Sequence, residues 1–153
     1  MSRKEQIQAD LIYIDMKQEV ESMLKSKEIN PTVNRMLVLD YLLELKSSIS
    51  LTDLELSLES FDRVTLYRTL KTFEERGLVH KIEDGMGITK FAICQDSCKA
   101  GMHHDLHVHF YCHNCKQTFC LPKTQIPEVK LPENYQRQEM ELIVKGICSA
   151  CAK

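Results

Sequence analysis

The sequence predicts an α+β protein in which a winged helix-turn-helix precedes a small α/β domain. Three observations support this fold class. The first 75 residues show helical periodicity and helix caps, and a two-stranded hairpin signal follows them. All thirteen cysteines and histidines then lie between His80 and Cys151. The chain therefore divides into a half without these residue types and a half rich in metal-ligand side chains.

The first two helices are predicted from apolar periodicity. Residues 5–28 place five apolar side chains near one helical face, namely Ile7, Leu11, Ile14, Val20 and Leu24. Asn30 and Pro31 then supply an N-cap and a first helical residue for a second helix. The apolar residues of that second helix are Met36, Leu39, Leu42 and Leu43.

Two further helices are indicated by their caps. Ser50 and Asp53 resemble a capping box that opens a short third helix. Asp62 is suited to cap a fourth helix, and Gly77 to end it in the left-handed conformation. The buried stripe of the fourth helix is expected to be Leu66, Leu70 and Phe73.

A hairpin is predicted after these helices. Residues 78–82 and 88–93 read as two strands on either side of the turn sequence Asp84-Gly-Met-Gly87. Helices followed by a hairpin are typical of a winged helix-turn-helix, with the fourth helix as recognition helix and the hairpin as wing. Beyond a polar linker, further strands are expected at residues 107–111, 117–121 and 140–145. Prolines indicate a loop or short helix before the last strand.

Composition places the chain among soluble globular proteins, with 43% hydrophobic and 27% charged residues. No apolar stretch is long enough to span a membrane, and the charged N-terminus lacks the apolar segment of a signal peptide. A cytoplasmic location is expected. In that reducing compartment, paired cysteines are more often metal ligands than disulfides.

Two C-x-x-C motifs, Cys112–Cys115 and Cys148–Cys151, form the most specific signal in the sequence. One such turn presents two thiolates to one ion, and two turns complete a tetrahedral four-cysteine zinc site. A closed shell of four thiolates leaves no open coordination position. This zinc is therefore expected to hold the fold and not to catalyse.

The fourth helix is the candidate for DNA contact. The net charge of −2 gives no general support for nucleic-acid binding. Between Arg63 and Lys81, however, basic residues outnumber acidic ones, and a local positive patch meets phosphates when a helix presents it. The side chains expected to point outward are Arg63, Thr65, Tyr67, Arg68 and Lys71. Arg, Tyr and Thr contact bases or phosphates.

The order of these motifs resembles the ferric uptake regulator family. The resemblance is carried by Arg35, by Val64-Thr-Leu-Tyr67-Arg68, by the His-x-His-x-x-Cys-x-x-Cys run from His107, and by the terminal C-x-x-C. It spans nearly the whole chain. Members of this family are homodimeric metal-sensing repressors with an N-terminal winged helix and a C-terminal α/β dimerisation domain.

The resemblance implies roles and partners. Tyr67 and Arg68 become DNA contacts, Arg35 becomes a phosphate contact, and the four paired cysteines match the family's structural zinc site. The partners implied are a double-stranded DNA operator and a second copy of the chain, with no membrane and no small-molecule substrate. The expected domains are a winged-helix DNA-binding domain at 1–94, a linker or hinge at 95–105, and a zinc-binding dimerisation domain at 106–153.

The family's hinge metal site is the point of greatest departure. The corresponding positions here are Ser48, Ala92, His107, His109 and Cys120. Only the histidine pair is retained, so the oxygen ligands that suit iron or manganese are missing. A third family site is expected to be absent, because Leu106 and Val108 occupy its ligand positions.

Instead, His80 after the recognition helix and Cys94 at the end of the wing resemble the zinc uptake regulator branch. Imidazole and thiolate ligands favour Zn²⁺ over Fe²⁺ or Mn²⁺. The predicted regulatory ligands are His80, Cys94, His107 and His109. Cys120, His103 and Asp105 compete for one position, whereas Cys98, His104 and His113 are unassigned.

The predicted function is a metal-dependent, DNA-binding transcriptional repressor that controls metal-ion homeostasis and responds to zinc. Two metal ions are expected: a structural zinc ion and a second, regulatory divalent ion, which is predicted to be zinc as well. Metal at the hinge would fix the angle between the two recognition helices of a dimer. An iron- or manganese-responsive regulator and a peroxide sensor of the same family are the alternatives, since seven cysteines keep thiol oxidation open. An enzyme such as a zinc deaminase is not expected, because the histidine-rich stretch lacks its His-x-Glu motif.

Overall fold

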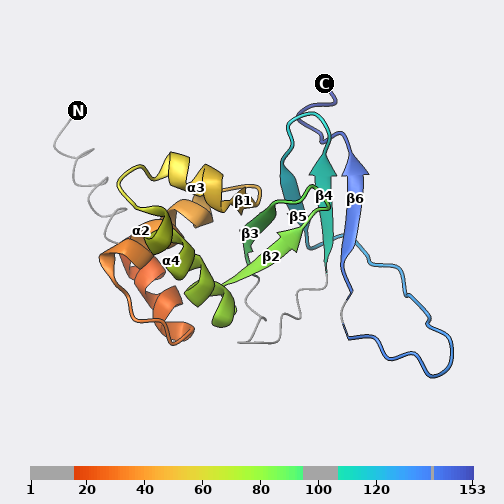
Figure 1. The fold of residues 1–153 in the computed structure, drawn as a ribbon, viewed down its shortest axis with the longest axis horizontal. Coiled ribbons are helices and arrows are strands. Elements are labelled where there is room, and N and C mark those ends of the chain that lie inside the picture. Colours follow the sequence, from red (N-terminus) through yellow and green to blue (C-terminus); the bar gives the residue numbers. More distant parts are fainter. Residues whose placement is uncertain (1–15, 95–106, 139) are drawn as a thin grey trace.

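The computed structural model describes residues 16–94, 107–138 and 140–153. Apart from one two-residue strand between α2 and α3, the helices come first along the chain and the strands of two small sheets follow them (Figure 1). The wing sheet has the strand order β1-β3-β2, and its strands are β1 Ile49–Ser50, β2 Val79–Glu83 and β3 Thr89–Ile93. The second sheet has the order β5-β4-β6, with β4 Val108–Cys112, β5 Thr118–Leu121 and β6 Leu142–Gly146. The predicted fold class is confirmed.

The first two helices follow the predicted periodicity, with one correction. Residues 16–26 are helical, and the earlier part of the predicted first helix lies outside the described residues. Helix α2 is Val33–Glu44, and its N-cap is Thr32, whose hydroxyl accepts a hydrogen bond from the Arg35 backbone N–H. The predicted cap at Asn30 is wrong. The Asn30 carbonyl instead accepts a hydrogen bond from Arg35 Nη1 at 2.9 Å.

The predicted caps of α3 (Leu51–Ser57) and α4 (Arg63–Glu75) are confirmed. The Ser50 hydroxyl accepts from the Asp53 N–H at 3.1 Å and donates to its carboxylate at 2.6 Å. Asp62 accepts from the Thr65 N–H at 3.0 Å. Gly77 ends α4 with a φ of 66°, a left-handed conformation that favours glycine.

The hydrophobic core lies between the helices and one face of the wing sheet. Leu66, Leu70 and Phe73 of α4 are fully buried there, as predicted, and Val79 and Phe91 join them from the wing strands. Burial of these side chains supplies most of the driving force for this half of the molecule. No helix in the described ranges is long and apolar enough to cross a membrane.

The other face of the wing sheet is turned toward the second sheet (Figure 1). Along β2 and into the turn, His80, Ile82 and Asp84 are buried, whereas Lys81 and Glu83 are exposed. This alternation follows from the two-residue period of a strand. The wing therefore lies between the helical core and the second sheet.

Strand register sets which side chains stand beside one another in the wing sheet. The antiparallel strands β2 and β3 form the predicted hairpin, and they pair His80 with Ala92 and Ile82 with Lys90. Strand β1, which was not predicted, adds to β3 through Ile49. The wing thus has three strands, not two.

The second sheet combines an antiparallel and a parallel pair. Strand β5 runs antiparallel to β4 and pairs Cys120 with His109 and Thr118 with Tyr111. Strand β6 runs parallel to β4. Residues 122–138 between β5 and β6 form loops and turns without a helix, which decides between the two predicted possibilities for that segment.

Candidate metal centres and nucleic-acid interface

The four paired cysteines form one cluster, with sulfur atoms all within 4.8 Å of one another. Parallel pairing of β4 with β6 places Cys112 opposite Gly146, so both C-x-x-C turns begin at the same end of the sheet. An added Cβ at Gly146 would lie 3.2 Å from the Phe110 ring, so a larger residue there would have to displace the ring. The local backbone is thus suited to bringing four thiols together.

Backbone N–H groups prepare the Cys112 thiol for metal binding. Burial alone would raise its pKa, but backbone hydrogen bonds, led by the one from Cys148 at 3.3 Å, lower the pKa to about 6. A hydrogen bond with Cys148 raises the pKa of Cys151 to about 11. The thiolate is the form that binds metal, so the lowered pKa favours metal binding by Cys112.

A second cluster joins the two sheets. It consists of His80 from β2, His107 just before β4, His109 from β4 and Cys120 from β5, and their ligand atoms all lie within 4.8 Å of one another. The three histidines are each less than one-tenth exposed. Neighbouring imidazoles stand 4.5–5.5 Å apart between ring centroids. Three nitrogens and one sulfur are a donor set that a tetrahedral metal ion accepts.

The two nitrogens of His80 face different thiols. Its Nε2 lies 3.3 Å from His109 Nε2 and 3.6 Å from Cys120 Sγ. Its Nδ1 lies 3.6 Å from Cys94 Sγ, on the opposite side of the ring. The structure therefore brings Cys120 into the cluster and leaves Cys94 outside it. His103 and Asp105, the other competitors, lie outside the described residues.

The positions that correspond to the family's hinge site hold no carboxylate. The Ser48 N–H and hydroxyl both donate to the Thr118 carbonyl, at 2.8 and 3.0 Å. Ser48, Ala92 and Cys120 border a hollow of about 210 Å³ next to the second cluster. Of the four clustered ligands, Cys120 is thus the one that borders this hollow.

The outer face of α4 offers a set of exposed polar side chains. Tyr67 is half exposed, and Arg68 and Lys71 are exposed with it. Arg63 also points outward but forms an ion pair with Glu55 at 2.6 Å. These residues lie on the side of α4 opposite its buried stripe, where a DNA groove would have access.

Two residues of this face differ from the sequence expectation. Thr65 is half-buried and donates its hydroxyl to Asp62 at 2.6 Å, so it completes the helix cap. Val64 is 56% exposed at the start of α4 and was not predicted. The sequence pattern does indicate this exposure, because Val64 lies outside the buried stripe of Leu66, Leu70 and Phe73. An exposed valine there is suited to contact a thymine methyl group.

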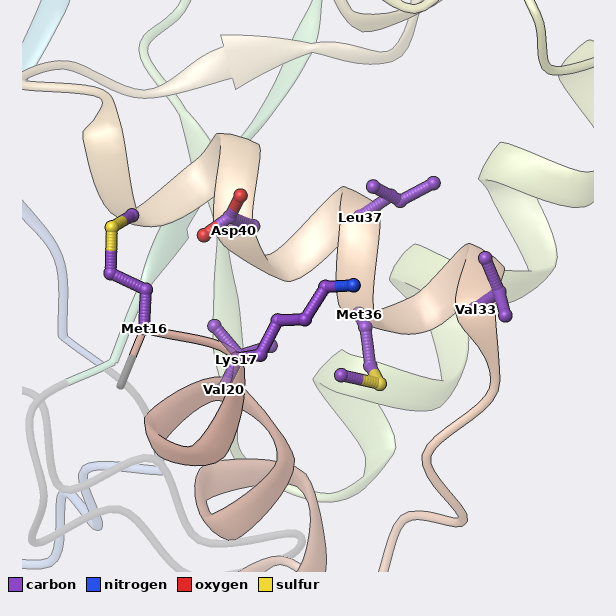
Figure 2. Close-up of a pocket in the computed structure, with 7 residues that line it drawn as sticks. All are labelled: Met16, Lys17, Val20, Val33, Met36, Leu37 and Asp40. Atoms are coloured by element: carbon purple, nitrogen blue, oxygen red, sulfur yellow. The ribbon is translucent and has the colours of Figure 1, made fainter. Parts of the chain in front are cut away.

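A groove of about 240 Å³ lies between helical residues 16–26 and α2. Its lining residues are Met16, Lys17, Val20, Val33, Met36, Leu37 and Asp40. Figure 2 shows Lys17 extended along the space between the two helices. The lining is mostly apolar and includes no residue of either cluster, so this groove is not the candidate metal or DNA site.

Comparisons with solved structures show the same fold. A zinc uptake regulator complexed with zinc and DNA is 18% identical over 90% of this chain and 93% of its own, with a TM-score of 0.61. The holo protein XcZur is 20% identical over 90% and 97%, with a TM-score of 0.61. The Vibrio cholerae ferric uptake regulator is 19% identical over 84% and 98%, with a TM-score of 0.57.

A comparison with curated protein sequences gives no match. The family model described as the ferric uptake regulator family matches residues 26–145, which include α4, the hairpin strands β2 and β3, the whole second cluster, and Cys112 and Cys115 of the first. The match covers well over half of the chain and agrees with the fold and with the motif order. The chain therefore belongs to the ferric uptake regulator family.

Proposed function

We propose that this protein is a zinc-responsive transcriptional repressor that controls metal-ion homeostasis in the cytoplasm and acts as a regulator, not as an enzyme. The observation that carries this proposal is the second cluster, which draws ligands from both the wing sheet and the second sheet. A metal ion bound there would couple the part of the chain that contacts DNA to the part that dimerises. These two parts are the proposed domains, residues 1–94 and 106–153, with residues 95–105 as the proposed hinge between them.

The four-cysteine cluster is assigned to a structural zinc ion. Its four thiols sit at the ends of β4 and β6, where two chain segments separated by more than thirty residues must be held together. Zinc bound by four cysteines contributes directly to folding free energy. Its shell is closed, so this ion would be retained when the second metal exchanges.

The second cluster is assigned to the regulatory metal, with His80, His107, His109 and Cys120 as ligands. Three imidazoles and a thiolate favour Zn²⁺ over Fe²⁺ and Mn²⁺, which prefer harder oxygen ligands. Cys94 is then a hydrogen-bond partner of His80 Nδ1, which orients the ring so that Nε2 points at the ion. The similarity to a zinc uptake regulator bound to zinc and DNA supports this assignment.

The proposed mechanism is a shift in population. Without the second metal, the wing sheet and the second sheet sample several relative orientations. The metal binds the orientation in which its four ligands converge, and apparent DNA affinity rises with the fraction of dimers in that orientation. Both recognition helices of the homodimer then meet successive major grooves of the operator.

The DNA interface is assigned to α4 with a contribution from α2. The side chains proposed to reach DNA are Arg35, Arg63, Val64, Tyr67, Arg68 and Lys71. Thr65 contributes by holding the cap that shapes the start of α4. Phosphate contacts of the basic residues would position the helix, and Val64 and Tyr67 would contact base edges.

A peroxide-sensing regulator is the second candidate, because two thiols flank the His80 ring. In this function, peroxide would oxidise a thiol at the contact between the two sheets and change DNA binding without any exchange of metal. A metal panel separates these functions. Protein that retains only its four-cysteine zinc is titrated with Zn²⁺, Fe²⁺ or Mn²⁺, and its binding is followed on an operator duplex selected from random sequence at fixed salt.

The proposal predicts that micromolar Zn²⁺ restores operator binding. A response to Fe²⁺ or Mn²⁺ with none to Zn²⁺ would establish the iron-type alternative. Operator binding that ignores all three metals but is lost on treatment with peroxide would establish the thiol sensor.

A further inference from the structure

A buried lysine stands beside the second cluster and has no part in the proposed metal site. Lys90 Nζ donates to Asp84 Oδ2 at 2.8 Å, to the Lys116 carbonyl at 2.9 Å and to Thr118 Oγ1 at 3.0 Å. An ammonium group has three donors, and all three have an oxygen partner here. The Tyr111 ring lies 5.3 Å away from the same ammonium.

These partners come from both sheets. Asp84 and Lys90 belong to the wing, whereas Lys116, Thr118 and Tyr111 belong to the second sheet or the turn before it. Asp84 and Thr118 are fully buried, and the Thr118 hydroxyl donates to Asp84 Oδ2 at 2.7 Å. The Lys90–Asp84 ion pair lies within the wing, but its bonds to Thr118 and to the Lys116 carbonyl form only when the sheets are docked. A buried ion pair needs such further hydrogen bonds to offset its desolvation.

Strand register places this polar cluster one step from the metal ligands. In the wing, Ala92 pairs with His80, and Lys90 is two residues along β3. In the second sheet, Cys120 pairs with His109, and Thr118 is two residues along β5. Two strand residues span about 7 Å. The two clusters are therefore adjacent rows of one interface between the sheets.

We propose that Lys90 and Asp84 are positioning residues that hold the wing against the second sheet, in the orientation in which the four metal ligands converge. The Lys90 ammonium is a permanent positive charge at this interface, beside the site proposed for the exchangeable metal ion. The part of this proposal that concerns metal affinity rests on the proposed regulatory site, whereas the docking of the sheets does not.

The physical consequence is that the polar cluster and the metal site are thermodynamically linked, because both favour the docked arrangement of the two sheets. If the polar cluster raises the fraction of molecules with docked sheets, it lowers the apparent dissociation constant of the metal by the same factor. A cluster that stabilised only the wing turn would have no such effect. The Asp84 carboxylate does accept a hydrogen bond from the Met86 N–H within that turn, so the Thr118 contact is the one to test.

Two variants and one control test the proposal. Lys90→Met removes the ammonium and keeps most of the side-chain volume. Thr118→Val removes the hydroxyl that bonds to both Lys90 and Asp84, and leaves the ion pair within the wing and the Lys116 carbonyl in place. Lys81→Met is the matched control. Lys81 also lies on a wing strand and also forms an ion pair, with Glu74 at 2.8 Å, but it is about half exposed.

The first readout is the affinity of the exchangeable site for Zn²⁺, measured by competition with a chromophoric chelator on protein that retains its four-cysteine zinc. We expect Lys90→Met and Thr118→Val to weaken binding by about tenfold or more, because the metal must then dock the sheets itself. Lys81→Met should match the wild type. Wild-type affinity in both Lys90→Met and Thr118→Val overturns the proposal.

The second readout needs no exchangeable metal. The Ser48 amide donates to the Thr118 carbonyl across the sheets, so its hydrogen exchange reports docking, and the Cys94 amide, which donates to Leu78 within the first half, is the internal reference. Faster exchange at Ser48 with an unchanged rate at Cys94 is expected in both variants. If the wild type binds no second metal, the proposed regulatory site is wrong, but faster exchange at Ser48 in the two variants still supports the docking role. An unchanged Ser48 rate overturns the docking role.

Discussion

Replacing Cys120 or Cys94 by alanine distinguishes the roles of the two thiols that flank the His80 ring. Cys120 Sγ lies within 4.8 Å of all three imidazole ligand atoms, whereas Cys94 Sγ lies 3.6 Å from His80 Nδ1, the ring nitrogen that does not face His109 and Cys120. Cys120 is therefore expected to bind the metal and Cys94 to orient a ligand. The sequence alone had nominated Cys94, which makes the pair of variants a direct comparison of the two assignments.

The expected magnitudes differ for the two thiols. Loss of an outer hydrogen-bond partner costs about 10–100-fold in metal affinity, or about 1.4–2.7 kcal/mol, and this range applies to Cys94→Ala. Loss of a direct ligand should exceed it, so Cys120→Ala is expected to weaken Zn²⁺ binding by more than about 100-fold. Both proteins should keep the four-cysteine zinc, since neither residue belongs to that cluster.

Cobalt substitution at the exchangeable site gives the more decisive assay. A thiolate ligand produces an intense sulfur-to-cobalt charge-transfer band in the near ultraviolet, which imidazole ligands do not. The band should persist in Cys94→Ala and vanish in Cys120→Ala. A band that persists in Cys120→Ala and vanishes in Cys94→Ala would exclude Cys120 as a ligand and return Cys94 to the ligand set.

The same geometry makes three further predictions. Cys148→Ser should release the tightly held zinc and lower the melting temperature, as checked by metal analysis and calorimetry, because the four-cysteine ion contributes to folding. Tyr67→Ala and Arg68→Ala should each weaken operator binding by roughly 1–3 kcal/mol in anisotropy titrations without loss of metal. Burial alone would raise the pKa of Asp84, but hydrogen bonds from Lys90 and Thr118 lower it. The unfolding free energy that Asp84→Asn loses in chemical denaturation should therefore be constant above about pH 5 and shrink as pH falls below the ordinary value near 3.9.

Local signals in the sequence predicted the first half well. Ser50, Asp62 and Gly77 each carry a capping function that depends on residues three or four positions away, so their roles are visible without a fold. Strand β1 was not predicted, because two residues are too few to show alternation. Thr32 replaced Asn30 as a cap because both are good N-caps and only the path of the chain chooses between them.

The four-cysteine cluster was predictable for the same reason, since each C-x-x-C is a local unit. The place of Cys120 beside the three histidines was not predictable, because it depends on how β5 registers against β4 and on how the wing faces the second sheet. Lys90 and Asp84 were missed because charged residues beside a turn are usually solvated. Their burial is a property of the contact between the sheets, which no local pattern encodes.

The proposed switch depends on one exchangeable ion at the second cluster. Its most direct test compares operator affinity, as free Zn²⁺ is raised at fixed salt, for wild type, His107→Ala and His113→Ala, each retaining its four-cysteine zinc. His113 is the control, because it is exposed and close to β4 but outside the cluster. We predict that wild type and His113→Ala gain affinity together while His107→Ala stays at its metal-free level. Equal zinc responses in all three proteins would show that this cluster is not the switch.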